Sequence, residues 1–182
     1  MLVTNFLEIE GVKLINSISS EDLRGRFVKF QSTNLLDQEI DSVAISFNPQ
    51  VGTIRGLHFQ VEPYAEEKII SCIQGATFEV IVDIRLNSRS FGKVASFQLT
   101  QESDEQVYLP KGVAHGFQTL LPNSIVHYIL TSQYSQPSSF SINPFSLIGI
   151  NWPIADFMIS EKDQKGISVE VAAQRYADSI AV

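Results

Sequence analysis

The chain has 182 residues, with 44% hydrophobic and 18% charged side chains, a composition typical of a globular domain that can bury a core. Its net charge is −7 and it has no long block of Lys or Arg, so we do not expect a nucleic acid or an anionic membrane as a partner. No run of about 18 apolar residues is present to cross a bilayer. Cys72 is the only cysteine and the first residues lack a secretory-signal pattern, so we expect a cytoplasmic protein.

Short runs rich in β-branched and aromatic residues predict strands along most of the chain. In chain order, the predicted strands cover residues 28–32, 42–47, 68–73, 77–85, 94–99, 107–109 and 124–130. Gly, Pro and Asn separate these runs, and a helix is predicted over 169–177, where Glu, Ala, Gln and Arg are frequent. This pattern indicates an antiparallel sandwich or barrel. We expect one domain over 1–182, with a core over about 22–163 and a C-terminal tail over 164–182.

Two of the three histidines lie in short segments that also contain turn residues and aromatic residues. His58 follows Arg55-Gly56-Leu57, and His115 lies within the segment 110–117. Imidazole exchanges protons near neutral pH, so both are candidates for an active site. A metal site of the cupin type needs a second histidine two residues after the first, but position 60 is Gln. We therefore expect no metal, with a weak site that uses one of the glutamates at 66 and 67 left open.

Several motifs occur in a fixed order: residues 52–60, 82–85 with 90–92, 110–117, 149–153 and 160–163. Together they resemble the dTDP-4-dehydrorhamnose 3,5-epimerase family, from about Asp22 to Asp163. The resemblance implies an all-β, cupin-type jelly-roll barrel with a short C-terminal helical segment. It also implies a homodimer that acts without a metal or other cofactor. The implied substrate is a nucleotide-diphosphate sugar of the 4-keto-6-deoxy class, in deoxysugar biosynthesis for a surface polysaccharide or glycoconjugate.

The resemblance also implies roles for four residues in the chemistry. A ketone at C4 acidifies the protons at C3 and C5, so inversion needs a base, stabilisation of the enolate and an acid on the opposite face. His58 matches the family's base and Tyr128 its general acid. Asp163 matches the acidic residue that orients the base, although Asp83 stays open as an alternative partner. Lys68 matches a lysine near the developing oxyanion.

Six further residues fall on implied substrate-binding positions: Arg24, Arg55, His115, Tyr134, Lys162 and Gln60. The arginines suit a diphosphate because a guanidinium can donate two hydrogen bonds to it. Tyr134 matches an aromatic residue that stacks on the base, and stacking does not select a nucleotide.

Each role has a structural alternative. Tyr128 and Tyr134 could be strand aromatics, Lys68 a charge on an edge strand, and Asp163 a helix cap.

The chain departs from the family pattern in the part that recognises the substrate. Lys29 stands where the family usually has Glu, Ile129 where it has Lys, and residues 44–46 replace an expected Gln and Asn. We therefore expect the family's chemistry on a changed substrate, with inversion at C3, C5 or both. Three alternatives stay open: a cupin 3,4-ketoisomerase, a sugar-nucleotide-binding module without catalysis and, last, a metal-dependent oxygenase.

Overall fold

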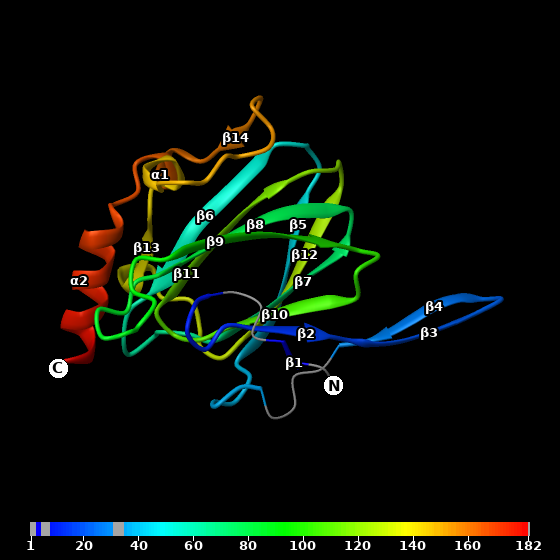
Figure 1. Ribbon diagram of the computed structural model, residues 1–182, viewed down its shortest axis with the longest axis horizontal. Coiled ribbons are helices and arrows are strands. Elements are labelled where there is room, and N and C mark those ends of the chain that lie inside the picture. The colour runs from blue at the N-terminus through cyan, green and yellow to red at the C-terminus, as the bar shows by residue number, and fades with distance from the viewer. Residues whose placement is uncertain (1–2, 5–7, 31–34, 182) are drawn as a thin grey trace.

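The computed structural model describes residues 3–4, 8–30 and 35–181 (Figure 1). The strands in this part of the chain are β1 (Val3–Thr4), β2 (Lys13–Asn16), β3 (Ile18–Asp22), β4 (Gly25–Lys29), β5 (Ser42–Asn48), β6 (Thr53–Gln60), β7 (Lys68–Gln74), β8 (Ala76–Asp83), β9 (Val94–Thr100), β10 (Glu105–Leu109), β11 (Val113–Thr119), β12 (Ser124–Leu130), β13 (Ser139–Ser141) and β14 (Met158–Ile159). The helices are α1 (Glu161–Gln164) and α2 (Val169–Ile180), with short 3-10 helices at η1 (Gln136–Ser138) and η2 (Pro144–Ser146).

Most strands belong to two sheets that face each other (Figure 1). The first sheet has the order β1-β2-β10-β7-β12-β5, and the second has the order β13-β6-β11-β8-β9. Neighbouring strands in both sheets are antiparallel, while β14 adds to β6 in parallel. The predicted all-β, antiparallel architecture is confirmed.

The hydrophobic core extends beyond residues 22–163 on both sides. Ile9, Val12 and Ile15 near the N-terminus are at most 2% exposed. At the other end, Ala172 and Tyr176 of α2 pack against the cluster around Leu57 and Val80 of the second sheet. The segment from Ile9 to Ile15 and helix α2 therefore add buried apolar side chains outside residues 22–163.

The predicted strands at 42–47, 68–73, 94–99 and 124–130 correspond to β5, β7, β9 and β12. The predicted strand at 77–85 ends earlier, at Asp83, and the one at 28–32 is displaced to Gly25–Lys29. Residues 31–32 of that prediction lie outside the described residues. The helix predicted over 169–177 is α2, which continues to Ile180 and begins after Ser168, whose hydroxyl accepts from the Val171 amide.

One hairpin lies apart from the two sheets. Strands β3 and β4 pair only with each other in the described chain and extend well beyond the barrel (Figure 1). Leu23 at the tip is fully exposed, and Phe27 is 68% exposed. The first sheet ends at β5, where Val43, Ile45 and Phe47 are also exposed. Exposed apolar side chains are therefore present both on the hairpin and on this edge strand.

Candidate active site

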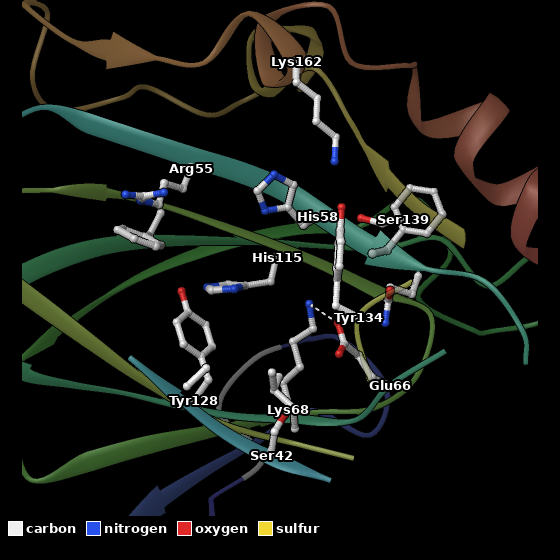
Figure 2. Close-up of a pocket in the computed structure, with 15 residues that line it drawn as sticks. Ser42, Arg55, His58, Glu66, Lys68, His115, Tyr128, Tyr134, Ser139 and Lys162 are labelled. Atoms are coloured by element: carbon white, nitrogen blue, oxygen red, sulfur yellow. Dashed lines mark ion pairs between the residues drawn. The ribbon is translucent and has the colours of Figure 1, made fainter. Parts of the chain in front are cut away.

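A cavity of about 460 Å³ opens between the two sheets (Figure 2). Strand β6 and α1 supply residues on one side, and β7 and β12 supply residues on the other. Its polar lining includes Arg55, His58, Gln60, Glu66, Lys68, His115, Tyr128, Tyr134, Ser139 and Lys162. Nine of the ten predicted site residues are therefore brought together here or directly behind the wall; the exception is Arg24.

His58 and His115 lie close together because strands β6 and β11 pair with their backbones at very short range. His58 and His115 are direct partners in this antiparallel ladder, so their side chains lie on the same face of the sheet. A Cβ on Gly56 would fall 2.6 Å from the Gly116 Cα, and a Cβ on Gly116 would fall 2.7 Å from the Arg55 carbonyl oxygen. Gly56 also has a positive φ of 111°. The glycines beside the histidines allow this close approach.

His58 and Asp163 form a hydrogen-bonded pair. His58 Nε2 lies 2.7 Å from Asp163 Oδ1, and the same oxygen accepts a 2.8 Å hydrogen bond from the Ser141 hydroxyl. The Gly56 amide donates to Oδ2 at 3.1 Å. Burial opposes ionisation, but these hydrogen bonds outweigh it and hold the pKa of Asp163 well below its usual value. The carboxylate therefore orients the ring with a proton on Nε2, which leaves Nδ1 able to accept one.

Asp163 reaches this position from a separate element. Ser160 caps α1 by accepting a hydrogen bond from the Asp163 amide, and the carboxylate is 5% exposed. Asp83, the alternative partner of His58, instead accepts hydrogen bonds from Arg85, Ser88 and Ser90. The alternative assignment of Asp83 is therefore wrong, because its carboxylate pairs with Arg85 instead.

Tyr128 lies on the opposite sheet, with its ring near His115 (Figure 2). Burial, and secondarily the Glu79 carboxylate, raises the pKa of the phenol above its usual value, so it keeps its proton at neutral pH. His115 Nε2 lies 2.6 Å from Glu79 Oε2, and the Thr77 hydroxyl donates to the other Glu79 oxygen. Burial lowers the pKa of His115 despite this carboxylate, so the ring is neutral and donates from Nε2.

Lys68 and Glu66 form an ion pair in the cavity wall. The two charged atoms are 3.0 Å apart, and each side chain is about one-tenth exposed. The neighbouring Glu67 points away from the cavity, where it accepts hydrogen bonds from the Tyr108 hydroxyl and from two amides of the 37–38 segment. Lys68 is thus a buried, paired ammonium on the same sheet as Tyr128, not an exposed edge-strand charge.

Two cationic side chains lie on the other side of the cavity (Figure 2). Arg55 donates from Nε to Asn48 Oδ1 at 2.8 Å, and no described residue bonds to its terminal nitrogens, which can therefore bind a ligand. Lys162, the residue before Asp163 on α1, extends from above. Tyr134 lies between Lys162 and Glu66 and is 69% exposed.

Gln60 is held in a way that differs from the expected substrate contact. Its side-chain nitrogen donates to the backbone carbonyls of Tyr64 and Gln133, and its side-chain oxygen accepts from the Ser135 amide. The hydrogen bonds to Gln133 and Ser135 involve the residues on either side of Tyr134. Gln60 therefore positions the loop that carries Tyr134, since its amide is already occupied by backbone groups.

Arg24 does not reach the cavity of its own chain. Its side chain is 90% exposed at the tip of the β3–β4 hairpin and pairs with Asp22 at 2.6 Å. Three further residues support the site without having been predicted from the sequence: Asn48, Glu79 and Ser141. Glu66, considered from the sequence only as a possible ligand of a weak metal site, pairs with Lys68 instead. Within the described part of the chain, no group of three or more His, Cys, Asp and Glu residues is arranged to hold a metal ion.

Comparison with known proteins identifies the family of this chain. The family model for dTDP-4-dehydrorhamnose 3,5-epimerase matches residues 6–170. The chain belongs to the dTDP-4-dehydrorhamnose 3,5-epimerase family. A family member from Sinorhizobium fredii, described as dTDP-4-dehydrorhamnose 3,5-epimerase, is 40% identical over 164 residues, which cover 86% of this chain and 84% of the relative.

Solved family structures share the fold closely. The epimerase from Elizabethkingia anophelis superposes with a TM-score of 0.84 at 32% identity, covering 92% of this chain and 96% of that one. ChmJ, a 3'-monoepimerase from Streptomyces bikiniensis solved with dTDP-quinovose, has a TM-score of 0.84 at 27% identity, covering 94% and 89%. The expected cupin-type jelly roll is confirmed, and so is the assignment to an isomerase family. No helix among the described residues is long and apolar enough to cross a membrane.

Proposed function

We propose that this enzyme inverts C3, C5 or both carbons of a nucleotide-linked 4-keto-6-deoxy sugar through an enolate. The observation that carries the proposal is the placement of His58 and Tyr128 on opposite sheets around one cavity, with Lys68 beside them. A base and an acid on opposite faces of a bound ring are what inversion requires. The relative from Sinorhizobium fredii is named for dTDP-4-dehydrorhamnose, a sugar of this class, and the similar protein NovW is described as a 4-keto-6-deoxy sugar epimerase.

The proposed mechanism assigns one proton transfer to each face. His58 Nδ1 removes the proton from a carbon next to the ketone, while Asp163 stabilises the imidazolium that forms. The Lys68 ammonium donates to the ketone oxygen as it becomes an enolate. The Tyr128 phenol then gives its proton to the opposite face of the same carbon, which leaves that carbon inverted.

The cations on the His58 side of the cavity suit the diphosphate. Arg55 is fixed by Asn48, so its free guanidinium nitrogens can bind two phosphate oxygens with little loss of side-chain entropy. Lys162 supplies a second positive charge on the same side of the cavity. His115 donates from Nε2 to Glu79, so its Nδ1 accepts a hydrogen bond from a sugar hydroxyl. Tyr134 offers an exposed ring on which the base can stack.

The proposed functional unit is a cytoplasmic homodimer. Exposed apolar residues on the β3–β4 hairpin and on β5 are suited to burial against a second copy. Arg24, at the tip of the hairpin, does not line the cavity of its own chain, and in the proposed dimer we place it at the partner's cavity. The buried free thiol of Cys72 fits a reducing compartment.

Product analysis by NMR tests the proposed reaction. The purified protein is incubated with dTDP-, CDP- and GDP-linked 4-keto-6-deoxyhexoses, and the configuration at C3 and C5 is read from proton couplings. We expect inversion at one or both carbons with at least one nucleotide, and none with His58→Ala. A carbonyl that moves to C3 would instead identify a ketoisomerase. Tight binding without any product would identify a binding module.

A further inference from the structure

Glu66 places a carboxylate inside the candidate active site. It precedes β7 by two residues, and in an extended segment residues two apart point to the same side, so Glu66 and Lys68 both face the cavity. The intervening Glu67 points to the opposite side, toward Tyr108. The dashed line in Figure 2 marks the 3.0 Å ion pair between Glu66 and Lys68.

The Glu66 carboxylate keeps hydrogen-bonding capacity for a ligand. Lys68 is its only hydrogen-bond or ion-pair partner among the described residues, whereas a carboxylate can accept about four hydrogen bonds. Its side chain is 11% exposed, so bulk water can solvate little of it. The other charged residues in the cavity wall, Arg55, Lys68 and Lys162, are cationic and suit anionic or partly negative oxygens. Among the charged residues of the cavity wall, Glu66 is therefore the hydrogen-bond acceptor, and it needs a hydrogen-bond donor on the ligand.

We propose that Glu66 is a specificity-determining residue that, together with Lys68, recognises the 3-hydroxy-4-keto group of the sugar. This inference rests on the proposed function, which places the ketone oxygen at Lys68. A hydroxyl on the carbon next to a ketone has its oxygen about as far from the ketone oxygen as two hydrogen-bonded atoms are from each other. The ion pair has the same spacing, with a donor beside an acceptor. Lys68 donates to the ketone, and Glu66 accepts from the 3-hydroxyl.

The pairing also explains how one ammonium can serve two partners. Lys68 has three N–H donors, so a bond to Glu66 leaves two for the ketone and its enolate. A ligand without the 3-hydroxyl would leave the buried Glu66 oxygen without a donor, and an unsatisfied charged acceptor is costly. Glu66 therefore discriminates against 3-deoxy sugars.

The test compares binding of two ligands to protein that cannot turn them over. Calorimetry measures the affinity of His58→Ala for dTDP-4-keto-6-deoxyglucose and for its 3-deoxy analogue. We expect the 3-hydroxy sugar to bind about 10- to 100-fold more tightly. Adding Glu66→Gln should reduce that ratio to about 3-fold or less, because the neutral amide is a weaker acceptor.

The matched control is Glu62→Gln, also in the His58→Ala background. Glu62 pairs with Lys111 at 3.1 Å and lies outside the cavity lining, so its loss should leave the ratio unchanged. Equal binding of the two sugars by His58→Ala would overturn the inference even if the Glu66 variant does not fold. A ratio that Glu66→Gln leaves intact would also overturn it. Failure of the wild-type enzyme to invert any sugar would count against the proposed function, whereas these binding ratios test Glu66 alone.

Discussion

At the scale of single residues, Asp163 connects stability to the proposed chemistry. Its carboxylate accepts from His58, Ser141 and the Gly56 amide, which joins α1 to β6 and β13. Because these hydrogen bonds lower the pKa of Asp163, they favour the folded, ionised state. The same contacts orient His58, the proposed base. One carboxylate therefore both stabilises the site and, in the proposed mechanism, activates its base.

Asp163→Asn should destabilise the fold in a pH-dependent way. The depressed pKa of Asp163 contributes stability above the unfolded-state value of about 3.9, and this contribution is lost as pH falls toward the folded-state pKa. We expect the variant to lose about 1–3 kcal/mol at pH 7 and the difference from wild type to shrink below about pH 4. Urea unfolding at both pH values measures it. The exposed Asp156→Asn is the control, and a pH-independent difference for Asp163→Asn would contradict this assignment.

The sequence predicted individual residues where a motif carried them. His58, His115, Lys68 and Tyr128 all line the cavity as expected. Glu79 was missed because nothing near it in sequence shows that it faces His115, which is 36 residues away. The role of Gln60 was missed for a similar reason, since two of its three partners, Gln133 and Ser135, lie 73 and 75 residues further along the chain. Contacts at such separations depend on the folded register.

At the scale of elements, the close pairing of β6 with β11 determines the geometry of the site. Gly56→Ala combines a positive φ with a clash against the Gly116 backbone, so the strands would have to separate. We expect a loss of at least about 3 kcal/mol in unfolding free energy and loss of turnover. Gly92→Ala is the matched control, because Gly92 has a positive φ of 75° but open space around it. It should cost about 1 kcal/mol. Equal losses measured by urea unfolding would show that the close approach is unimportant.

The elements that the sequence predicted best are those with regular apolar patterns. Strands β5, β7 and β12 contain β-branched residues between turn signals, and they were found nearly to their ends. Strands β6 and β11 were absent from the predicted strands, because Gly and His at their centres lower the β-propensity. The position of β4 was wrong because its exposed hairpin has no core to set the pattern.

At the scale of the whole molecule, the proposed dimer makes a prediction about mixed subunits. If Arg24 binds substrate in the partner's cavity, Arg24→Ala and His58→Ala subunits complement each other, since a mixed dimer contains one intact site. Each variant alone should be nearly inactive, and random exchange between equal amounts should restore about a quarter of wild-type activity. Sedimentation analysis checks that both variants remain dimeric. No recovery after verified exchange would contradict the trans role of Arg24.

Deuterium incorporation tests the central claim of two proton-transfer groups on opposite faces. The enzyme is incubated with its 4-keto-6-deoxy sugar nucleotide in deuterated water, and C3 and C5 are followed by NMR for wild type, His58→Ala and Tyr128→Phe. We predict deuterium at each inverted carbon for wild type and none for His58→Ala. Tyr128→Phe should exchange without inversion, because His58 can still remove and return a proton on one face. Exchange in His58→Ala at the wild-type rate would contradict the account.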